Sequence, residues 1–214
     1  MCFILKMKVL TLQTKLKMTV SLGITANRKK NGALLAYIAN KVPQINMRKM
    51  LKIIYLIDER FMKLRGFPFT WLDYYVWEKG PVAPEVYAIK EKDNFFSDFV
   101  RTKRSSDNKV IIYPLFAIND DPNGPFGELS EYDLSIINEE LLKYGDKTAD
   151  WLTNQTHLPD TLWTKTKSEH RVEFVDGKSD CCINMMDLIK DNEDFCEVYE
   201  DAKWNVGFQA QLNS

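Results

Sequence analysis

The chain has 214 residues, of which 45% are hydrophobic, 12% aromatic and 28% charged. These proportions are typical of a globular protein and exclude a wholly disordered or collagen-like chain. The net charge of −1 hides an uneven distribution, because residues 1–57 contain eleven basic and no acidic residues, whereas all 30 acidic residues follow them. No apolar run reaches the roughly 18 residues that a membrane-spanning helix needs, so none is predicted.

The charge distribution suggests three segments. We predict a basic N-terminal extension over residues 1–28, one compact domain over 29–190 and an acidic C-terminal tail over 191–214. The basic start fits a nucleic-acid contact, an acidic protein partner, or an internal pairing with the acidic end of the chain. The extension lacks clear periodicity, so a flexible arm, an added strand and translated upstream sequence all remain open.

The four cysteines match neither a paired zinc motif nor a disulfide framework: Cys2, Cys181, Cys182 and Cys196. This usage favours reduced thiols. Lysines interrupt the apolar stretch at the start of the chain, which argues against a signal peptide. We therefore expect a cytoplasmic protein without a bound metal or cofactor.

Two helices are expected in the first third of the chain. Apolar residues recur at helical spacing up to Pro43, where the first helix must end. A stronger repeat runs over 47–64, with Asn46 as a plausible N-cap and Gly66 as the residue that ends the helix. Charged residues such as Lys52 are expected mostly on the face opposite the apolar stripe.

An aromatic segment at residues 70–79 favours a strand. In a strand, Trp71, Tyr75 and Trp77 would share one face, and Tyr74 would lie on the other. One set should meet the core, and the other should meet solvent or a partner. Exposed Trp and Tyr side chains are frequent hot spots of protein interfaces.

Several turn signals follow this strand. Gly80-Pro81-Val82 predicts a rigid turn, because glycine frees the backbone and proline fixes φ. Pro84 suits the first turn of a short helix. Residues 99–116 predict two strands around a turn at 105–108, and this basic region fits an ordinary solvated face. Residues 119–127 predict a loop.

The second half continues with short helices. Ser130 and Asp133 have the spacing of a capping box, and Gly145 should end the helix that they begin. Thr148 should cap a short helix that ends near His157. One more short helix is predicted over 183–190. The tail after residue 190 is acidic, but its aromatic residues would let part of it dock. These elements predict a mainly α fold with a small β element (α+β), a single compact helical domain with a short antiparallel sheet or hairpin.

Signatures of catalysis are scarce in this sequence. It contains no glycine-rich phosphate loop and no Gly-x-Ser-x-Gly elbow. Only His157 and His170 could serve as an imidazole base, and no local signature supports either. We therefore do not expect an enzyme, with a hydrolase that uses His157 as the rival hypothesis.

Two blocks of residues carry a more specific signal. The first contains Lys52, Tyr55, Asp58, Gly66, Gly80, Pro81 and Val82. The second contains Lys143, Tyr144, Gly145, Thr156, His157 and Trp163. Their order and spacing resemble the Panacea domain, the SocA-like or GepA-like phage-associated antitoxin family. The resemblance covers about residues 31–163, although Pro159 does not directly precede Trp163 as it often does in the family.

The resemblance implies a largely helical antitoxin that neutralises a cognate toxin by direct protein contact. It also leaves open an adaptor that delivers the toxin to a Clp-type protease. The alternative is a DNA-binding autoregulator or phage-related regulatory protein that uses the basic N-terminal region. Candidate partner contacts lie around Gly80: Tyr75, Trp77, Lys79, Glu85 and Tyr87.

Each motif residue also has a structural interpretation. Lys52, Tyr55 and Asp58 share one helix face, which could meet a partner or hold the Gly80 segment. Alternatively, Tyr55 packs in the core while Asp58 pairs with a cation or caps a turn. His157 fits a cap for the last carbonyls of its helix, a partner contact or a catalytic base.

Overall fold

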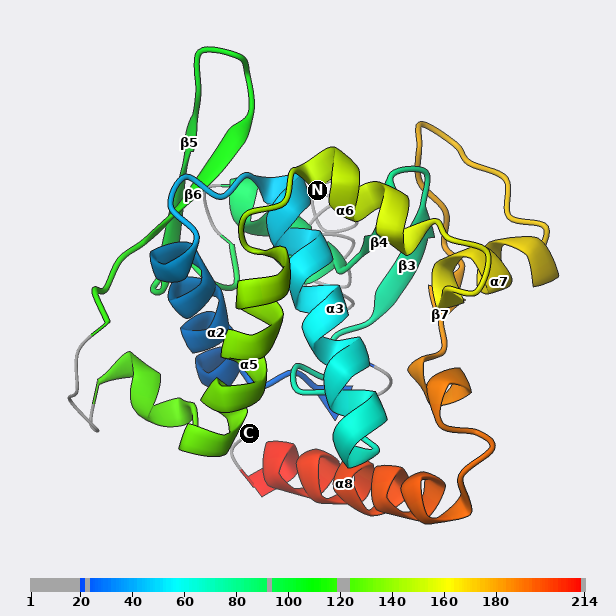
Figure 1. Ribbon diagram of the computed structural model, residues 1–214. Helices are drawn as coiled ribbons and strands as arrows, with labels where there is room; N and C mark the ends of the chain where they lie inside the picture. The colour runs from blue at the N-terminus through cyan, green and yellow to red at the C-terminus, as the bar shows by residue number, and fades with distance from the viewer. Residues whose placement is uncertain (1–19, 22–23, 92–93, 119–123, 213–214) are drawn as a thin grey trace, which may run out of the picture.

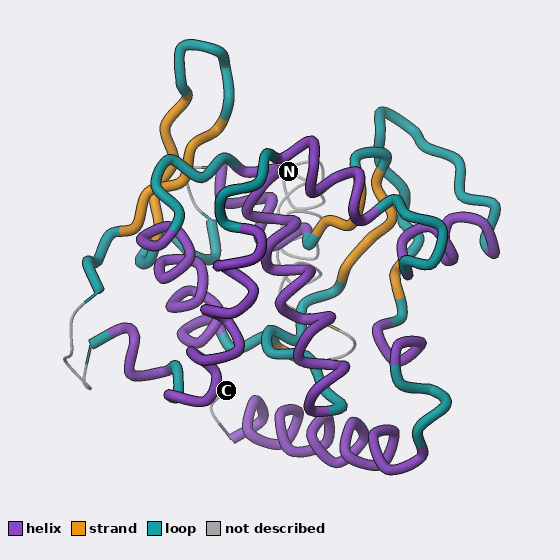
Figure 2. Tube along the Cα trace, in the orientation of Figure 1, coloured by secondary structure: helices purple, strands orange, loops and turns teal. Residues whose placement is uncertain are grey.

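The computed structural model describes residues 20–21, 24–91, 94–118 and 124–212. Predictions for residues 1–19 therefore lie outside the described residues. Within the described ranges, the structure combines seven α-helices with a few short antiparallel strands that lie beside the central helices (Figures 1 and 2), which confirms the predicted mainly α fold with a small β element. In these same ranges, no helix is both long and apolar enough to cross a membrane.

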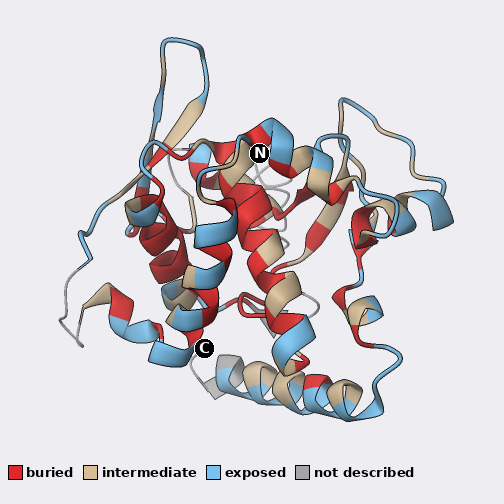
Figure 3. Cartoon of the chain, viewed as in Figure 1, coloured by how far each residue is buried: buried red, intermediate tan, exposed pale blue. Residues whose placement is uncertain are grey.

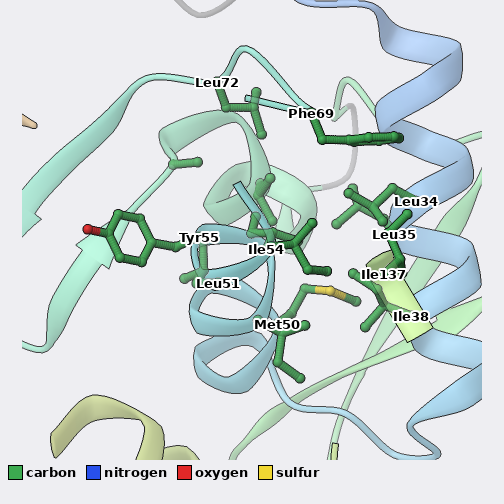
Figure 4. Packing of buried hydrophobic residues seen from close by; sticks show 14 of the residues in the cluster. Leu34, Leu35, Ile38, Met50, Leu51, Ile54, Tyr55, Phe69, Leu72 and Ile137 are labelled. Carbon is green, nitrogen blue, oxygen red and sulfur yellow. The ribbon is translucent and has the colours of Figure 1, made fainter. Parts of the chain in front are cut away.

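Helix α3 (Met47–Arg65) runs through the core beside α2 (Arg28–Lys41) and α5 (Glu131–Tyr144). Figure 3 shows that buried residues occupy most of α2 and α3. In Figure 4, Leu35 and Ile38 of α2 face Met50 and Ile54 of α3, and all four are at most 1% exposed. Removing these side chains from water is the main stabilising contribution to the fold.

The predicted ends of α3 are confirmed. The Asn46 side chain accepts a hydrogen bond from the Lys49 amide at 3.0 Å, which satisfies one of the free N–H groups of the first turn. Gly66 follows the helix with φ +79°, a left-handed conformation that favours glycine. Lys52 departs from the prediction, because only 1% of it is exposed. The face expected to be polar is therefore buried at this position.

Helices in the second half follow their predicted caps. Ser130 and Asp133 form the capping box of α5, and Gly145 is its C-cap. Thr148 caps α6 (Ala149–Thr156). Helix α7 (Leu162–Glu169) was not predicted, because its polar sequence lacks an apolar repeat; Thr161 caps it. The remaining helical segments before α5 are short: α4 (Pro84–Tyr87) and the 3₁₀ turns η1 (Ala88–Lys90) and η2 (Pro125–Glu128).

The central sheet has the order β4-β3-β7, with every pairing antiparallel. It contains β3 (Tyr74–Trp77), β4 (Gly80–Val82) and β7 (Cys182–Ile183). Strand β7 was not predicted, and the helix expected over 183–190 is only the 3₁₀ turn η3 (Met185–Leu188). A strand of two residues carries too little pattern to be recognised without its partner strand.

Gly80-Pro81-Val82 requires a correction. These residues form strand β4 rather than a turn, and Trp77 pairs with Gly80 in register. The turn lies one step earlier, at residues 78–79. Trp71 also differs from the prediction, because it lies before the strand with φ +56° and is buried, so it does not share a face with Tyr75.

Two further hairpins complete the β structure. The predicted pair of strands is confirmed as β5 (Val100–Arg104) and β6 (Val110–Pro114), joined through residues 105–109. Strands β1 (Val20–Ser21) and β2 (Ile24–Thr25) form a small separate pair near the start of the described chain.

The acidic tail forms helix α8 (Glu193–Leu212). Figure 1 shows α8 lying across the C-terminal end of α3. Tyr199 is 3% exposed and its ring lies 5.3 Å from that of Trp71, so an aromatic contact docks the helix as expected. Strand β2 also packs against α8.

Candidate functional site

Asp58 connects α3 to the segment before β3. Its carboxylate is fully buried and accepts hydrogen bonds from the amides of Phe69 and Thr70 at 2.8 and 2.9 Å. The hydroxyls of Thr70 and Tyr74 also donate to it, the latter at 2.6 Å. Burial raises the pKa of Asp58, and the bonds from Thr70 and Tyr74 oppose that rise. Asp58 thus caps the turn that follows α3, which is a structural role.

Tyr55 packs beside this cluster. Its ring meets that of Tyr74 edge-on, with the centroids 5.1 Å apart, and only 1% of each residue is exposed. This arrangement places both rings in the core. Tyr55 and Asp58 therefore both contact Tyr74 of strand β3. The third motif residue on this face of α3, Lys52, contacts strand β4 instead.

Lys52 holds strand β4. Its Nζ donates to the Pro81 carbonyl at 2.9 Å. Gly80 has φ +97°, and a Cβ there would lie 2.8 Å from both Lys52 Cε and Thr156 Oγ1. Only glycine therefore allows α3, β4 and α6 to approach this closely. Burial first, and then the nearby Arg48 guanidinium, lower the pKa of Lys52 to about 7.

His157 and Trp163 form an aromatic pair next to this cluster. Their rings stack with centroids 3.8 Å apart, and Trp163 Nε1 donates to the Trp77 carbonyl at 3.0 Å. His157 is the C-cap of α6 through its backbone amide. Its Nε2 is buried without a hydrogen-bond partner among the described residues, so the expected side-chain cap is replaced by ring stacking. Burial and the charge of Lys52 lower the pKa of His157.

A groove of about 690 Å³ opens above Lys52. It lies between the N-terminal turns of α3, the β3–β4 turn, the end of α4 and η1, the β5–β6 turn and the segment 176–178. We call it the basic groove, because seven basic residues line it: Arg48, Lys52, Lys79, Lys90, Arg104, Lys109 and Lys178. Its acidic lining residues are Glu78 and Asp176.

Two lysines of the basic groove lie over aromatic rings. Lys90 Nζ is 3.7 Å from the centre of the Tyr87 ring, and Lys178 Nζ is 5.0 Å from that of Trp77. The two rings meet edge-on with centroids 4.9 Å apart. Among the described residues, Lys52, Lys90 and Lys178 form no ion pair with a carboxylate. The groove thus combines an aromatic wall with cations that are available to an anionic ligand.

The five residues expected to contact a partner separate into two groups. Trp77, Lys79 and Tyr87 line the basic groove. Tyr75 is half-buried in the sheet, opposite Val82.

Glu85 needs a correction, because it is 4% exposed and is not presented to a partner as expected. Its burial raises the pKa of the carboxyl to about 7.

A second hollow, of about 390 Å³, lies between α3 and α5. Five of its six charged side chains form ion pairs with one another, including Arg60 with Glu139 at 3.4 Å and Lys63 with Glu59 at 3.4 Å. Such neutralised pairs on a surface contribute little to binding. We therefore regard the basic groove as the candidate site.

The described residues contain no group of three or more His, Cys, Asp or Glu side chains arranged to hold a metal ion. The groove instead gathers basic residues that the sequence pattern does not single out as a site. Arg104 and Lys109 come from the basic hairpin, for which the sequence favours a solvated face, and Lys90 and Lys178 carry no motif at all. In the sequence these four residues are marked only by their positive charge. That charge does not indicate that they lie together in the folded protein.

Comparison with known families identifies residues 50–164 as an antitoxin SocA-like, Panacea domain. No curated protein and no solved structure matched the chain. The match covers more than half of the chain and includes Lys52, Asp58, the Gly80 segment and His157. This chain therefore belongs to the SocA-like antitoxin family, as a Panacea-domain protein.

Proposed function

We propose that this chain is the antitoxin of a toxin–antitoxin pair and that it neutralises its toxin by direct contact at the basic groove, without chemistry of its own. Family membership supports the general antitoxin role. The observation that carries the contact surface is the wall formed by Trp77 and Tyr87, which remain partly exposed beside charged lysines. Aromatic side chains in such a setting are common centres of interface energy.

The floor of the basic groove favours binding rather than catalysis. Lys52, Gly80 and Thr156 hold three elements in fixed positions. A surface that is ordered before binding loses less conformational entropy when a partner docks. The motif residues accordingly support the groove from beneath, while its rim carries the side chains that meet the toxin.

The test is rescue of growth in cells that express the neighbouring toxin gene. Trp77→Ala with Tyr87→Ala should weaken toxin binding by about tenfold or more, because both rings form the aromatic wall of the proposed contact surface. The matched control is Tyr132→Ala with Trp151→Ala, two partly exposed aromatics outside the groove. Lys79→Glu, at an exposed turn, provides a variant with little risk to folding.

Full rescue by Trp77→Ala/Tyr87→Ala and by Lys79→Glu, with unchanged toxin affinity, would contradict the proposed surface. Absence of any toxin next to the gene, or in complexes purified from cells, would contradict the antitoxin function itself. The half-life of the toxin separates two modes of action. Occlusion lengthens it, whereas delivery to a Clp-type protease shortens it.

A further inference from the structure

We propose that the basic groove recognises an acidic segment of its protein partner, with one carboxylate side chain of that segment pairing with Lys52. This inference rests on the proposed function, because the partner is taken to be the toxin. It adds the chemistry of the recognised segment. Charge, depth and size of the groove each point to this ligand.

The first argument for an acidic ligand is the charge of the basic groove. Seven basic residues line the groove against two acidic ones. Two of the seven already have carboxylate partners, because Arg48 pairs with Asp150 and Lys109 with Asp107. Lys52, Lys90 and Lys178 have no ion-pair partner among the described residues. Like charges gathered on one surface repel one another, and an anionic ligand relieves this repulsion. The remainder of the chain has the opposite character, because residues 58–214 carry 18 basic and 30 acidic residues.

The second argument is the depth at which Lys52 lies in the basic groove. Lys52 lines the groove, yet it is only 1% exposed, and the Pro81 carbonyl is the one hydrogen-bond acceptor that the described residues give it. An ammonium group has three donors, so two remain for a ligand. A slender group such as the end of a Glu or Asp side chain can reach this depth. The attraction between an ammonium group and a carboxylate is stronger in a buried, low-dielectric site than at an exposed one.

Size and surroundings favour a peptide over a nucleic acid. A volume of about 690 Å³ accommodates a short stretch of side chains. The phosphates of a duplex would remain at the rim, where Glu78 and Asp176 repel them, and would leave Lys52 without a partner. The chain's own acidic helix α8 is docked at the opposite end of α3 and does not fill the groove (Figure 1).

The test measures binding of the full chain to a labelled oligo-glutamate peptide, with oligo-glutamine of equal length as the uncharged control. The peptide should bind saturably and more weakly as salt rises. Lys90→Glu with Lys178→Glu should lower its affinity by about tenfold or more, since both cations then become repulsive. Lys29→Glu with Lys165→Glu, exposed lysines on α2 and α7, should change it less than about twofold.

Lys52 is tested through the pH dependence of peptide binding. The ammonium group pairs with a carboxylate only when protonated, so affinity should fall as pH rises through about 7. Lys52→Met should bind more weakly and lose this dependence, provided that circular dichroism shows it folded. The charged and titratable groups near Lys52 are Arg48 and His157. His157→Gln should therefore retain the dependence.

Three results would overturn the inference. One is oligo-glutamate binding no tighter than oligo-glutamine binding. Another is equal loss of affinity in the groove pair and the control pair. The third is tighter binding of DNA of the same total charge, which would favour the nucleic-acid alternative. If a toxin binds with unchanged affinity to Lys90→Glu/Lys178→Glu, the acidic segment is excluded while the antitoxin function stands.

Discussion

At the scale of single residues, Asp58 and Gly80 fix the region beneath the groove by different means. Asp58 supplies acceptors to four donors from residues 69, 70 and 74. Gly80 supplies empty space, because any larger residue would meet Lys52 and Thr156. A hydrogen-bond network and a missing side chain thus both determine how β3 and β4 sit against α3.

Asp58→Ala should lower the free energy of unfolding by about 3 kcal/mol or more, because buried donors would lose their acceptor. Asp201→Ala, at an exposed position on α8, should change it by less than about 0.5 kcal/mol. Denaturant unfolding of both variants measures the difference. Similar stability of the two variants would show that the donors find water or another acceptor.

Gly80→Ala should destabilise the protein by about 1–3 kcal/mol, because alanine is strained at φ +97° and its Cβ would press on Lys52 and Thr156. Gly207 offers the matched control, since a Cβ there meets nothing within 4 Å in a helix. Gly207→Ala should raise stability by up to about 1 kcal/mol. Opposite signs in thermal unfolding support the close approach at Gly80, and equal signs contradict it.

At the scale of elements, α8 shows how an acidic segment joins the fold. Its charges face solvent while Tyr199 packs against Trp71, and Phe195 lies against Gly66 at the end of α3. The contact is aromatic rather than ionic.

Tyr199→Ala should lower stability by about 2–4 kcal/mol through the loss of a buried aromatic side chain. Trp204→Ala, at a residue 67% exposed on the same helix, should have an effect of about 0.5 kcal/mol or less. Chemical denaturation compares the two variants. If Tyr199→Ala is as stable as Trp204→Ala, α8 contributes nothing to the folded domain.

At the scale of the whole molecule, two buried ionisable groups make stability depend on pH. Burial raises the pKa of Glu85 to about 7. The contribution of Glu85 to the free energy of unfolding is therefore present at low pH and is lost as pH rises from about 4.5 to about 7. The pKa of Lys52 is lowered to about 7, so its contribution grows as pH rises from about 7 to about 10.5. Each charged form is penalised by burial, and both penalties are present near pH 7.

Unfolding free energies measured across pH should isolate these two groups. In the wild type, Glu85 should lower the free energy of unfolding by up to about 1.4 kcal/mol per pH unit between pH 4.5 and 7. Glu85→Gln should remove this fall. Lys52 should raise the free energy of unfolding at a comparable rate above pH 7, and Lys52→Met should remove this rise. Parallel pH profiles for wild type and both variants would contradict the assigned burial of these charges.

Sequence alone determined the helices whose signals are local. Asn46 and Gly66 bound α3, and Ser130 begins α5, because caps and apolar repeats act within a few residues. The motif around Lys52 and Gly80 likewise indicates the family through residue order and spacing. It does not indicate that Lys52 is buried, since helical spacing alone places it with the charged residues.

Tertiary structure alone decided the groove and the small sheet. Lys52, Lys90 and Lys178 lie far apart in the sequence, and only the packing of α3, η1 and the segment before β7 brings them together. Strand β7 exists because β3 offers it an edge, and Gly80 belongs to strand β4 because Trp77 pairs with it. Such contacts join distant residues, and no local pattern of apolar or charged residues encodes which of them will meet.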